Sequence, residues 1–448
     1  MGAATPRGGA PLPREPTTRQ IDRRVVALAI PAVGALIADP LLGVVDTAVA
    51  GRVSVTALGA LGLGTALLTA GTWIFNFLVV GTTTSVARAM GAGDAEAAGR
   101  RVAHAAWIAA GLGLVVGAAL LVGADLFVRT TGAVDALVDP AVTYMRIRAV
   151  GLPFILLGMV GHGALRGVGD TRTPLVIVLV ANAVNAALDV VLVVVFDAGL
   201  VGVAWATVAS EVVAVAMMLA VRRRAGLLLS GHGRPNRAAV RAMFVVSRDV
   251  VLRTGGLLLG LLLIATAAAR VDIATAAGHQ VLFQIYLLTA FVQDSVAVAG
   301  QTMIGTALGR GDAVGTQAIV RRLTGWGVVL GVGSAAGLLS LGGILPPVLT
   351  DDPAALAAIA AAWTVASIAQ LPGGVAFVLD GVLMGADDWA YLRTWTVTAA
   401  LGAGLAAQLV TMSGGGLRGL WWCVVGMTVV RAISLLLRVR SGGWVVSA

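Results

Sequence analysis

The chain has 448 residues, of which 58% are hydrophobic and only 12% are charged, and its mean hydropathy is +0.94. Soluble domains carry about twice that charged fraction, so this composition excludes a water-soluble globular protein. All 31 lysine or arginine positions hold arginine, dispersed between apolar runs, so the net charge of +9 indicates membrane topology rather than a nucleic-acid surface.

The amino-terminal segment, residues 1–20, is rich in Pro, Arg, Thr and Gly, and we expect a disordered cytoplasmic tail. A helix needs about 20 apolar residues to cross a bilayer. Twelve such stretches follow, at approximately 25–50, 57–87, 101–123, 138–165, 173–196, 199–221, 248–269, 275–306, 319–344, 353–380, 391–412 and 417–439. The first stretch is too long and too charged for a cleaved signal peptide. The predicted fold class is an all-α integral membrane protein with twelve transmembrane helices.

The distribution of arginine predicts the orientation of these helices. An even number of spans places both termini on one side of the membrane. With the amino terminus inside, most arginines fall in cytoplasmic segments, and the outer segments hold only Arg52, Arg129, Arg270 and Arg418. We therefore predict a multi-pass protein of the inner (plasma) membrane with both termini in the cytoplasm.

An internal duplication divides the chain. A constant shift of 218 residues superimposes residues 51–53 on 269–271, residues 89–94 on 307–312, and residues 163–170 on 381–388. Six helices per repeat make the halves parallel, with a cavity expected between them. The expected domains are a first lobe at 21–221, an Arg-rich cytoplasmic linker at 222–247, a second lobe at 248–440 and a carboxy-terminal tail at 441–448.

Polar side chains at bilayer depth concentrate in the first lobe. An aspartate there costs roughly 2.5 to 3.5 kcal/mol, so each one is a functional candidate. The candidates pair by helix, with Asp39 and Asp46 two turns apart on the first helix, Asn185 and Asp189 at i and i+4 on the fifth, and Thr207 and Glu211 at i and i+4 on the sixth. Together they predict a polar cavity lining.

Carboxylates that lie close together in a low dielectric cannot all stay ionised, because burial and like-charge repulsion both disfavour the anion. We expect at least one of these acids to hold a proton near neutral pH and to exchange it when a cation or a conformational change arrives. The 218-residue shift places Leu257 and Ile264 opposite Asp39 and Asp46, so the acidic cluster belongs to one lobe.

Further polar residues extend the expected cavity surface, and their roles stay open. These secondary cavity-lining candidates are Asn76, Glu211, Gln284, Asp294, Gln301 and Asp380. Structural alternatives also stay open. An arginine at depth, namely Arg146, Arg148 or Arg253, can pair with Asp46 or Asp189, and Asp380 can bond a helix end. Cys423 and the four scattered histidines favour neither redox chemistry nor a metal site, so we expect no cofactor and no enzymatic activity.

Six segments resemble the multidrug and toxic compound extrusion (MATE) family, and within it the DinF-type branch. The resemblance extends from about Ile21 to Arg440, and its most branch-specific segment is FVLDGVLMGADD at 377–388. The others are PLLGVVDTAVAGR at 40–52, MGAGD at 90–94, GHGALRGVGDTRTP at 161–174, NAALDVVLV at 185–193 and GVAWATV at 202–208.

This resemblance implies two six-helix lobes in a V around a central cavity, the MATE fold, and export of varied organic compounds in exchange for protons or sodium. The family's acid on helix 1 corresponds to Asp46, its Asn and Asp on helix 5 to Asn185 and Asp189, and its Thr on helix 6 to Thr207. Protonation of Asp46 is then expected to rearrange the hydrogen bonds around helix 1, close the first-lobe pocket and expel the substrate. The expected protein is a monomer in the lipid bilayer that binds a small organic substrate.

Several alternatives accompany this reading. Asp39 occurs in only part of the branch, which includes relatives that resemble organic-acid exporters. Lipid-linked precursor flippases share the superfamily but use an arginine-lined cavity. The second-lobe sodium site of the NorM-like branch has no clear match, because Arg253 and apolar residues occupy its positions, which favours protons over sodium.

Two alternatives lie outside this superfamily. Residues 167–170 spell the GxGD motif of intramembrane aspartyl proteases. However, Asp170 falls in a predicted cytoplasmic turn, between Arg166 and Arg172, without a catalytic partner at depth. A ligand receptor that does not transport would differ from the main reading only in a transport assay.

Overall fold

The computed structural model describes residues 16–224 and 237–444, and most of these residues are helical. In chain order the elements are α1 (Thr18–Val53), α2 (Val55–Trp73), the 3-10 turn η1 (Ile74–Asn76), α3 (Phe77–Gly91), α4 (Ala95–Thr130), α5 (Asp135–Gly167), α6 (Arg172–Asp189), the π-helical turn η2 (Val190–Val195), α7 (Gly199–Arg224), α8 (Arg237–Val271), α9 (Ile273–Gly309), α10 (Ala313–Ser340), α11 (Leu345–Leu349), α12 (Pro353–Ile368), α13 (Gln370–Gly385), α14 (Trp389–Met412) and α15 (Leu417–Ser441).

These helices confirm the predicted all-α class with twelve candidate membrane spans. Within the described ranges, eleven helices are long and apolar enough to cross a bilayer, and α12 with α13 makes a twelfth span bent by 46°. The second span combines α2, η1 and α3, and the fifth combines α6 with η2. Helix α8 begins at Arg237, so helix also covers residues 237–247 of the predicted linker. Most of the predicted amino-terminal tail lies outside the described residues.

Equivalent helices in the two halves of the chain begin with the same kind of side-chain cap. Ser54 caps α2 by accepting a hydrogen bond from the Ala57 amide at 2.9 Å, and Asp272, 218 residues later, caps α9 by accepting one from Thr275 at 2.6 Å. The same shift relates two further caps, Asp94 on α4 and Asp312 on α10. Such side chains satisfy amide groups that the first helical turn leaves unpaired.

Glycine contacts between helices repeat with the same shift, which supports the predicted duplication. In the first half α5 packs on α3 so closely that a methyl group on Gly163 would lie 2.5 Å from the Val79 carbonyl oxygen. In the second half α13 packs on α9, and a methyl group on Gly381 would lie 2.2 Å from the Ala297 carbonyl oxygen. Small residues allow this close packing of membrane helices.

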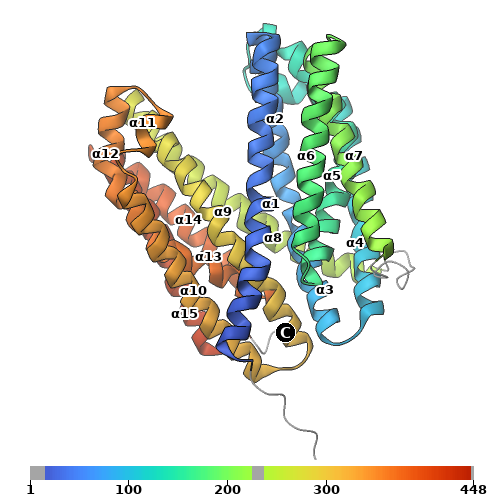
Figure 1. The fold of residues 1–448 in the computed structure, drawn as a ribbon. Helices are drawn as coiled ribbons and strands as arrows, with labels where there is room; N and C mark the ends of the chain where they lie inside the picture. Colours follow the sequence, from blue (N-terminus) through green and yellow to red (C-terminus); the bar gives the residue numbers. More distant parts are fainter. Residues whose placement is uncertain (1–15, 225–236, 445–448) are drawn as a thin grey trace, which may run out of the picture.

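The helices form two groups, which we call the first lobe (α1–α7) and the second lobe (α8–α15). The lobes meet at the end of the molecule where α1 begins and α15 ends, and they separate toward the other end (Figure 1). One buried apolar core at the meeting end includes Val25, Leu78, Ile304 and Leu383 from both lobes, whereas toward the other end each lobe has a core of its own. The shared core explains why the arms of the V join at one end only.

At the meeting end the lobes contact each other through two symmetric glycine positions. A methyl group on Gly91 of α3 would lie 2.2 Å from the Thr306 carbonyl oxygen of α9, and one on Gly309 of α9 would lie 2.1 Å from the Arg88 carbonyl oxygen of α3. Each of these contacts becomes the other under the 218-residue shift. The two halves therefore meet around an approximate twofold axis.

Polar contacts join the lobes at the same end. Gln301 Nε2 donates to the Val80 carbonyl and to Thr84 Oγ1, both at 2.8 Å, so this predicted cavity residue lies at the closed end of the V. Arg88 Nη1 lies 3.1 Å from Asp387 Oδ2. Asp387 has a φ of 59°, which a residue with a side chain rarely adopts, and Gly169 holds the equivalent position in the first half.

Replacing Gly91 with Ala is expected to separate the lobes at the meeting end, because the new methyl group cannot fit against the Thr306 carbonyl. The cost of such overpacking is about 1–3 kcal/mol. Thermal unfolding in detergent should show a clearly lower midpoint for Gly91→Ala. The matched control is Gly62→Ala, since nothing lies within 4 Å of a methyl group there. Equal midpoints for both variants would contradict the proposed contact.

Candidate functional site

The acids predicted on two separate helices meet inside the first lobe. The side chains of Asp46 on α1 and Asp189 on α6 interact directly. Asp46 is 9% exposed and Asp189 is 0% exposed. The sequence pattern brings them together because each occupies the inward face of its helix, and α1 packs against α6.

These two carboxyl groups lack hydrogen-bond donors. Among the described residues, Asp46 Oδ1 and both Asp189 oxygens are buried without a hydrogen-bonding partner. Two ionised carboxylates in contact repel each other, and neither can donate a hydrogen bond to the other. A proton shared between them would remove one charge and supply the missing donor. The pair is therefore chemically suited to take up and release a proton.

Amide and hydroxyl groups on α6 and α7 extend the polar surface beside the acid pair. Asn185 Nδ2 donates to Thr207 Oγ1 at 3.2 Å, and Thr207 Oγ1 donates in turn to the Val203 carbonyl at 2.9 Å. Asn185 is fully buried, and its Oδ1 is without a partner in the described part of the chain. The structure thus brings together the predicted residues Asp46, Asn185, Asp189 and Thr207.

A fifth predicted residue, Glu211, lies next to this group and pairs with an arginine. Arg148 Nη1 of α5 lies 2.6 Å from Glu211 Oε1 of α7, and the two side chains are 13% and 15% exposed. Arg148 also acts electrostatically on Asp46. Tyr144, one turn before Arg148, has its hydroxyl 3.4 Å from Thr65 Oγ1.

None of the arginines considered from the sequence hydrogen-bonds to the acid pair among the described residues. Arg148 bonds Glu211, Arg146 donates to the Leu121 carbonyl at 3.2 Å, and Arg253 bonds Asp380 in the other lobe. The local helix geometry also changes at the acid pair, since the π-helical turn η2 begins directly after Asp189. Such turns are frequent at functional sites.

Asn182 makes a contact between helices that the sequence alone did not predict. Its Nδ2 donates to the Ala38 carbonyl of α1 at 2.9 Å, which ties α6 to α1 about two turns before the acid pair. The signal was present, because Asn182, Asn185 and Asp189 follow each other at i, i+3 and i+7 on one helix face. Helix α1 continues through Pro40 without interruption, whereas the Asp39 side chain lies outside the described parts.

The buried charged residues of the second lobe form a separate cluster, and each of them lies on a helix. Asp380 Oδ2 of α13 accepts hydrogen bonds from Arg253 of α8, at 2.6 Å, and from Arg431 of α15. Asp294 of α9 acts electrostatically on all three groups. Arg431 also lies over the ring of Phe377, 5.2 Å from its centre. Asp380 is therefore the acid of a buried ion pair and not a side chain that bonds a helix end.

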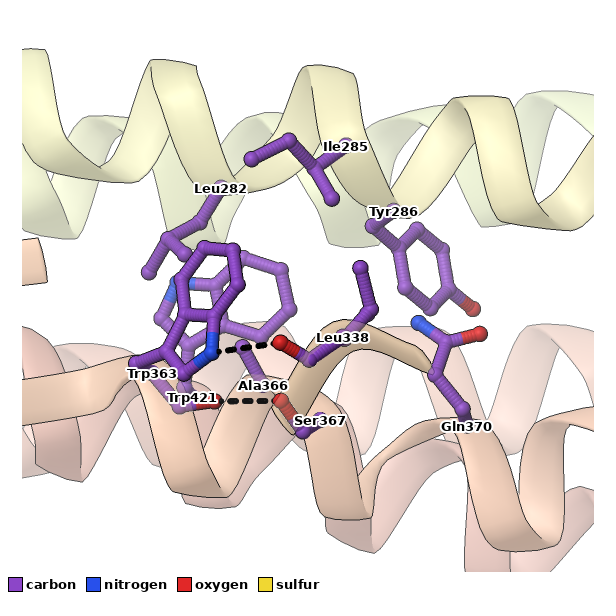
Figure 2. A pocket seen from close by; sticks show the side chains of 9 residues that line it. All are labelled: Leu282, Ile285, Tyr286, Leu338, Trp363, Ala366, Ser367, Gln370 and Trp421. Atoms are coloured by element: carbon purple, nitrogen blue, oxygen red, sulfur yellow. Dashed lines mark hydrogen bonds between the residues drawn. The ribbon is translucent and has the colours of Figure 1, made fainter. Parts of the chain in front are cut away.

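The other secondary candidates do not join either cluster. Asn76 lies at the end of η1 and Gln284 is exposed on α9. A small cavity lies at the break between α12 and α13, lined by Tyr286, Trp363, Gln370 and neighbours (Figure 2). Its volume of about 10 Å³ suits roughly one water molecule and excludes an organic ligand.

The family relationship follows from comparison with known proteins. The MatE family model matches residues 31–191 and 257–407, once in each lobe and together more than half of the chain. The chain belongs to the MATE family. MATE proteins are transporters rather than enzymes, so this chain is a membrane transporter of that family. The two matched segments correspond to the two halves of the duplication.

Named relatives support the family and the branch. Protein DETOXIFICATION 44, chloroplastic, from Arabidopsis thaliana is 28% identical over 96% of this chain and 85% of its own length. The DNA damage-inducible protein F of Escherichia coli (strain K12) is 28% identical over 92% of this chain and 91% of its own length. Among solved structures, one described as the outward-facing conformation of a multidrug resistance MATE family transporter of the MOP superfamily superimposes with a TM-score of 0.86. The match covers 94% of this chain and 95% of that chain. Because the two sequences are only 20% identical, this likeness supports the fold alone.

Removing Asp380 should destabilise the MATE fold of this chain, because two buried guanidinium groups would lose their shared carboxylate. Breaking a buried ion pair on one side costs about 3–5 kcal/mol. We expect Asp380→Asn to lower the thermal unfolding midpoint in detergent far more than Asp125→Asn, which breaks the exposed pair with Arg129. Similar midpoints for the two variants would rule out a stabilising role for the second-lobe cluster.

Proposed function

We propose that this transporter exports organic compounds in exchange for protons, and that the Asp46–Asp189 pair is the proton-exchanging switch. The observation that carries the proposal is the contact of two buried carboxyl groups without a cation or a hydrogen-bond donor among the described residues. A structural ion pair would include a positive partner, as Asp380 does in the second lobe. A pair without one is stable only with a proton, which it can exchange.

The cycle couples protonation to the position of α1. When a proton enters, the acid pair no longer repels itself, α1 can pack closely on α6, and the polar surface available to a substrate shrinks. When the proton leaves, the negative charge and the free oxygens of Asp46, Asp189 and Asn185 are again available to a substrate. Polar groups bonded in one state and free in the other give the proton and the substrate opposite effects, as exchange requires.

The energy of one proton is sufficient for useful export. Moving one charge down 100 mV releases about 2.3 kcal/mol, and half a pH unit adds about 0.7 kcal/mol. At about 1.4 kcal/mol per tenfold concentration ratio, this sustains roughly a hundredfold gradient of a neutral compound.

We infer that the transporter acts as a monomer within the lipid bilayer.

Replacing Asp46 with Asn should abolish proton-driven efflux, because the amide cannot exchange a proton. In everted vesicles with an imposed pH gradient, the accumulation ratio is expected to fall from as much as roughly a hundredfold to about one. Asp189→Asn should lose most transport and keep some substrate binding. Glu96→Gln, which alters an exposed pair with Arg100, is the matched control. Undiminished pH-driven efflux by folded Asp46→Asn would refute the switch, and efflux driven only by a sodium gradient would refute proton coupling.

We also infer that the end where the lobes meet faces the cytoplasm of the inner membrane, because Arg88, Arg310 and Arg322 of the predicted cytoplasmic segments lie there. Two exposed positions test this in a Cys423→Ser background: Ala92→Cys at the meeting end and Ser413→Cys at the opposite end. In right-side-out vesicles, a membrane-impermeant maleimide should label Ser413→Cys and spare Ala92→Cys until the vesicles are opened. The reverse pattern would invert the orientation.

A further inference from the structure

We propose that Glu211 is a positioning residue that holds Arg148 beside the acid pair and prevents this arginine from neutralising Asp46 permanently. This inference rests on the proposed proton exchange and adds a second pair of residues to it. Three carboxyl groups and one guanidinium share this part of the first lobe, so the choice of partner by Arg148 decides whether Asp46 is free to exchange its proton.

The pair is built into the helix packing. Arg148 Nη1 lies 2.6 Å from Glu211 Oε1, and both side chains are largely buried. Gly151, less than one turn after Arg148, makes room for this arrangement, because a methyl group there would lie 2.2 Å from Glu211 Oε2. A larger residue at 151 would push the carboxylate away from its present position.

The arginine has a second acid within its electrostatic reach. The charged or titratable groups that act on Arg148 are Glu211 of α7, Tyr144 of its own helix and Asp46 of α1. Asp189 of α6 is the direct partner of Asp46. If Glu211 lost its charge, Asp46 would be the remaining carboxylate next to the guanidinium. A charge-assisted hydrogen bond between them would favour the ionised form of Asp46.

The second lobe shows that helix packing alone does not require this pair. Under the 218-residue shift, Arg148 corresponds to Ala366 and Glu211 to Val429. The helices that carry Ala366 and Val429, α12 and α15, pack against each other without the ion pair. The acid pair is also missing there, since Ile264 and Ala407 replace Asp46 and Asp189. The Arg148–Glu211 pair therefore accompanies the exchanging acids.

The proposal makes a prediction with an unusual sign, namely that a second mutation restores what the first removes. In Glu211→Gln the released guanidinium should pair with Asp46 and keep it ionised, so proton-driven efflux should fall by about tenfold or more and lose its pH dependence. In the double variant Glu211→Gln with Arg148→Gln no guanidinium remains, and pH-dependent efflux should partly return. Glu211→Asp, which keeps the anchoring charge, should retain pH-dependent efflux.

Infrared difference spectroscopy of the purified protein measures the same residues without transport. The part of the protonated-carboxyl absorption that Asp46→Asn removes should titrate in the unmodified chain, disappear in Glu211→Gln and reappear in the double variant. Thermal unfolding identifies any variant that fails to fold, and Glu211→Asp then carries the test. Unchanged pH dependence in folded Glu211→Gln, or a double variant no better than Glu211→Gln in both measurements, would overturn the inference. Absence of proton-driven efflux in the unmodified chain, with the infrared pattern as described, would refute the proposed proton-coupled export and leave the positioning role intact.

Discussion

The constraint on which the first lobe depends is the cost of placing carboxyl groups in an apolar medium without compensating charge. Asp46 and Asp189 meet where no cation bonds them among the described residues. Three nearby donors are engaged elsewhere, since Asn185 donates to Thr207, Asn182 to the α1 backbone, and Arg148 to Glu211. The pair is therefore balanced neither by a bonded guanidinium nor by a hydrogen-bond donor among these residues, and the proposed proton exchange rests on this arrangement.

The two lobes share a backbone plan and use charge differently. In the second lobe the carboxylate of Asp380 has two guanidinium partners, so its charge is compensated in the structure itself. In the first lobe the equivalent position is His162, and the acids lie elsewhere, on α1, α6 and α7. One lobe holds a compensated cluster whose ion pairs join the three helices α8, α13 and α15, and the other holds an uncompensated pair at a boundary between helices. The duplicated scaffold therefore carries compensated and uncompensated carboxyl groups in different halves.

Most of the fold could be predicted from the sequence, and the polar contacts only in part. Spans, duplication and the shared faces of Asn185 with Asp189 follow from hydropathy and helical spacing, which are properties of single segments. The partner of Arg148 could not be predicted, because the sequence offered Asp46 or Asp189 as its partner and only the packing of α5 on α7 selects Glu211. Gln301 is a polar residue at bilayer depth and was therefore predicted to line the cavity. Its side chain instead donates a hydrogen bond to α3, across the contact between the two lobes. The role of Asp387 could not be predicted either. Its positive φ is visible only in the structure, and its partner Arg88 belongs to the other lobe.

The glycine contacts at the meeting end bear on how the two halves of the chain came to share one fold. Gly91 faces the backbone of residue 306, and Gly309 faces the backbone of residue 88, so each half offers the other the same surface. Such self-complementary surfaces are the hallmark of an isologous dimer. A six-span ancestor with one copy of this glycine could pair with itself in the same geometry, and both copies would insert in the same direction. Fusion of two such chains would need only a connector on one side of the membrane, because six crossings return the chain to its starting side.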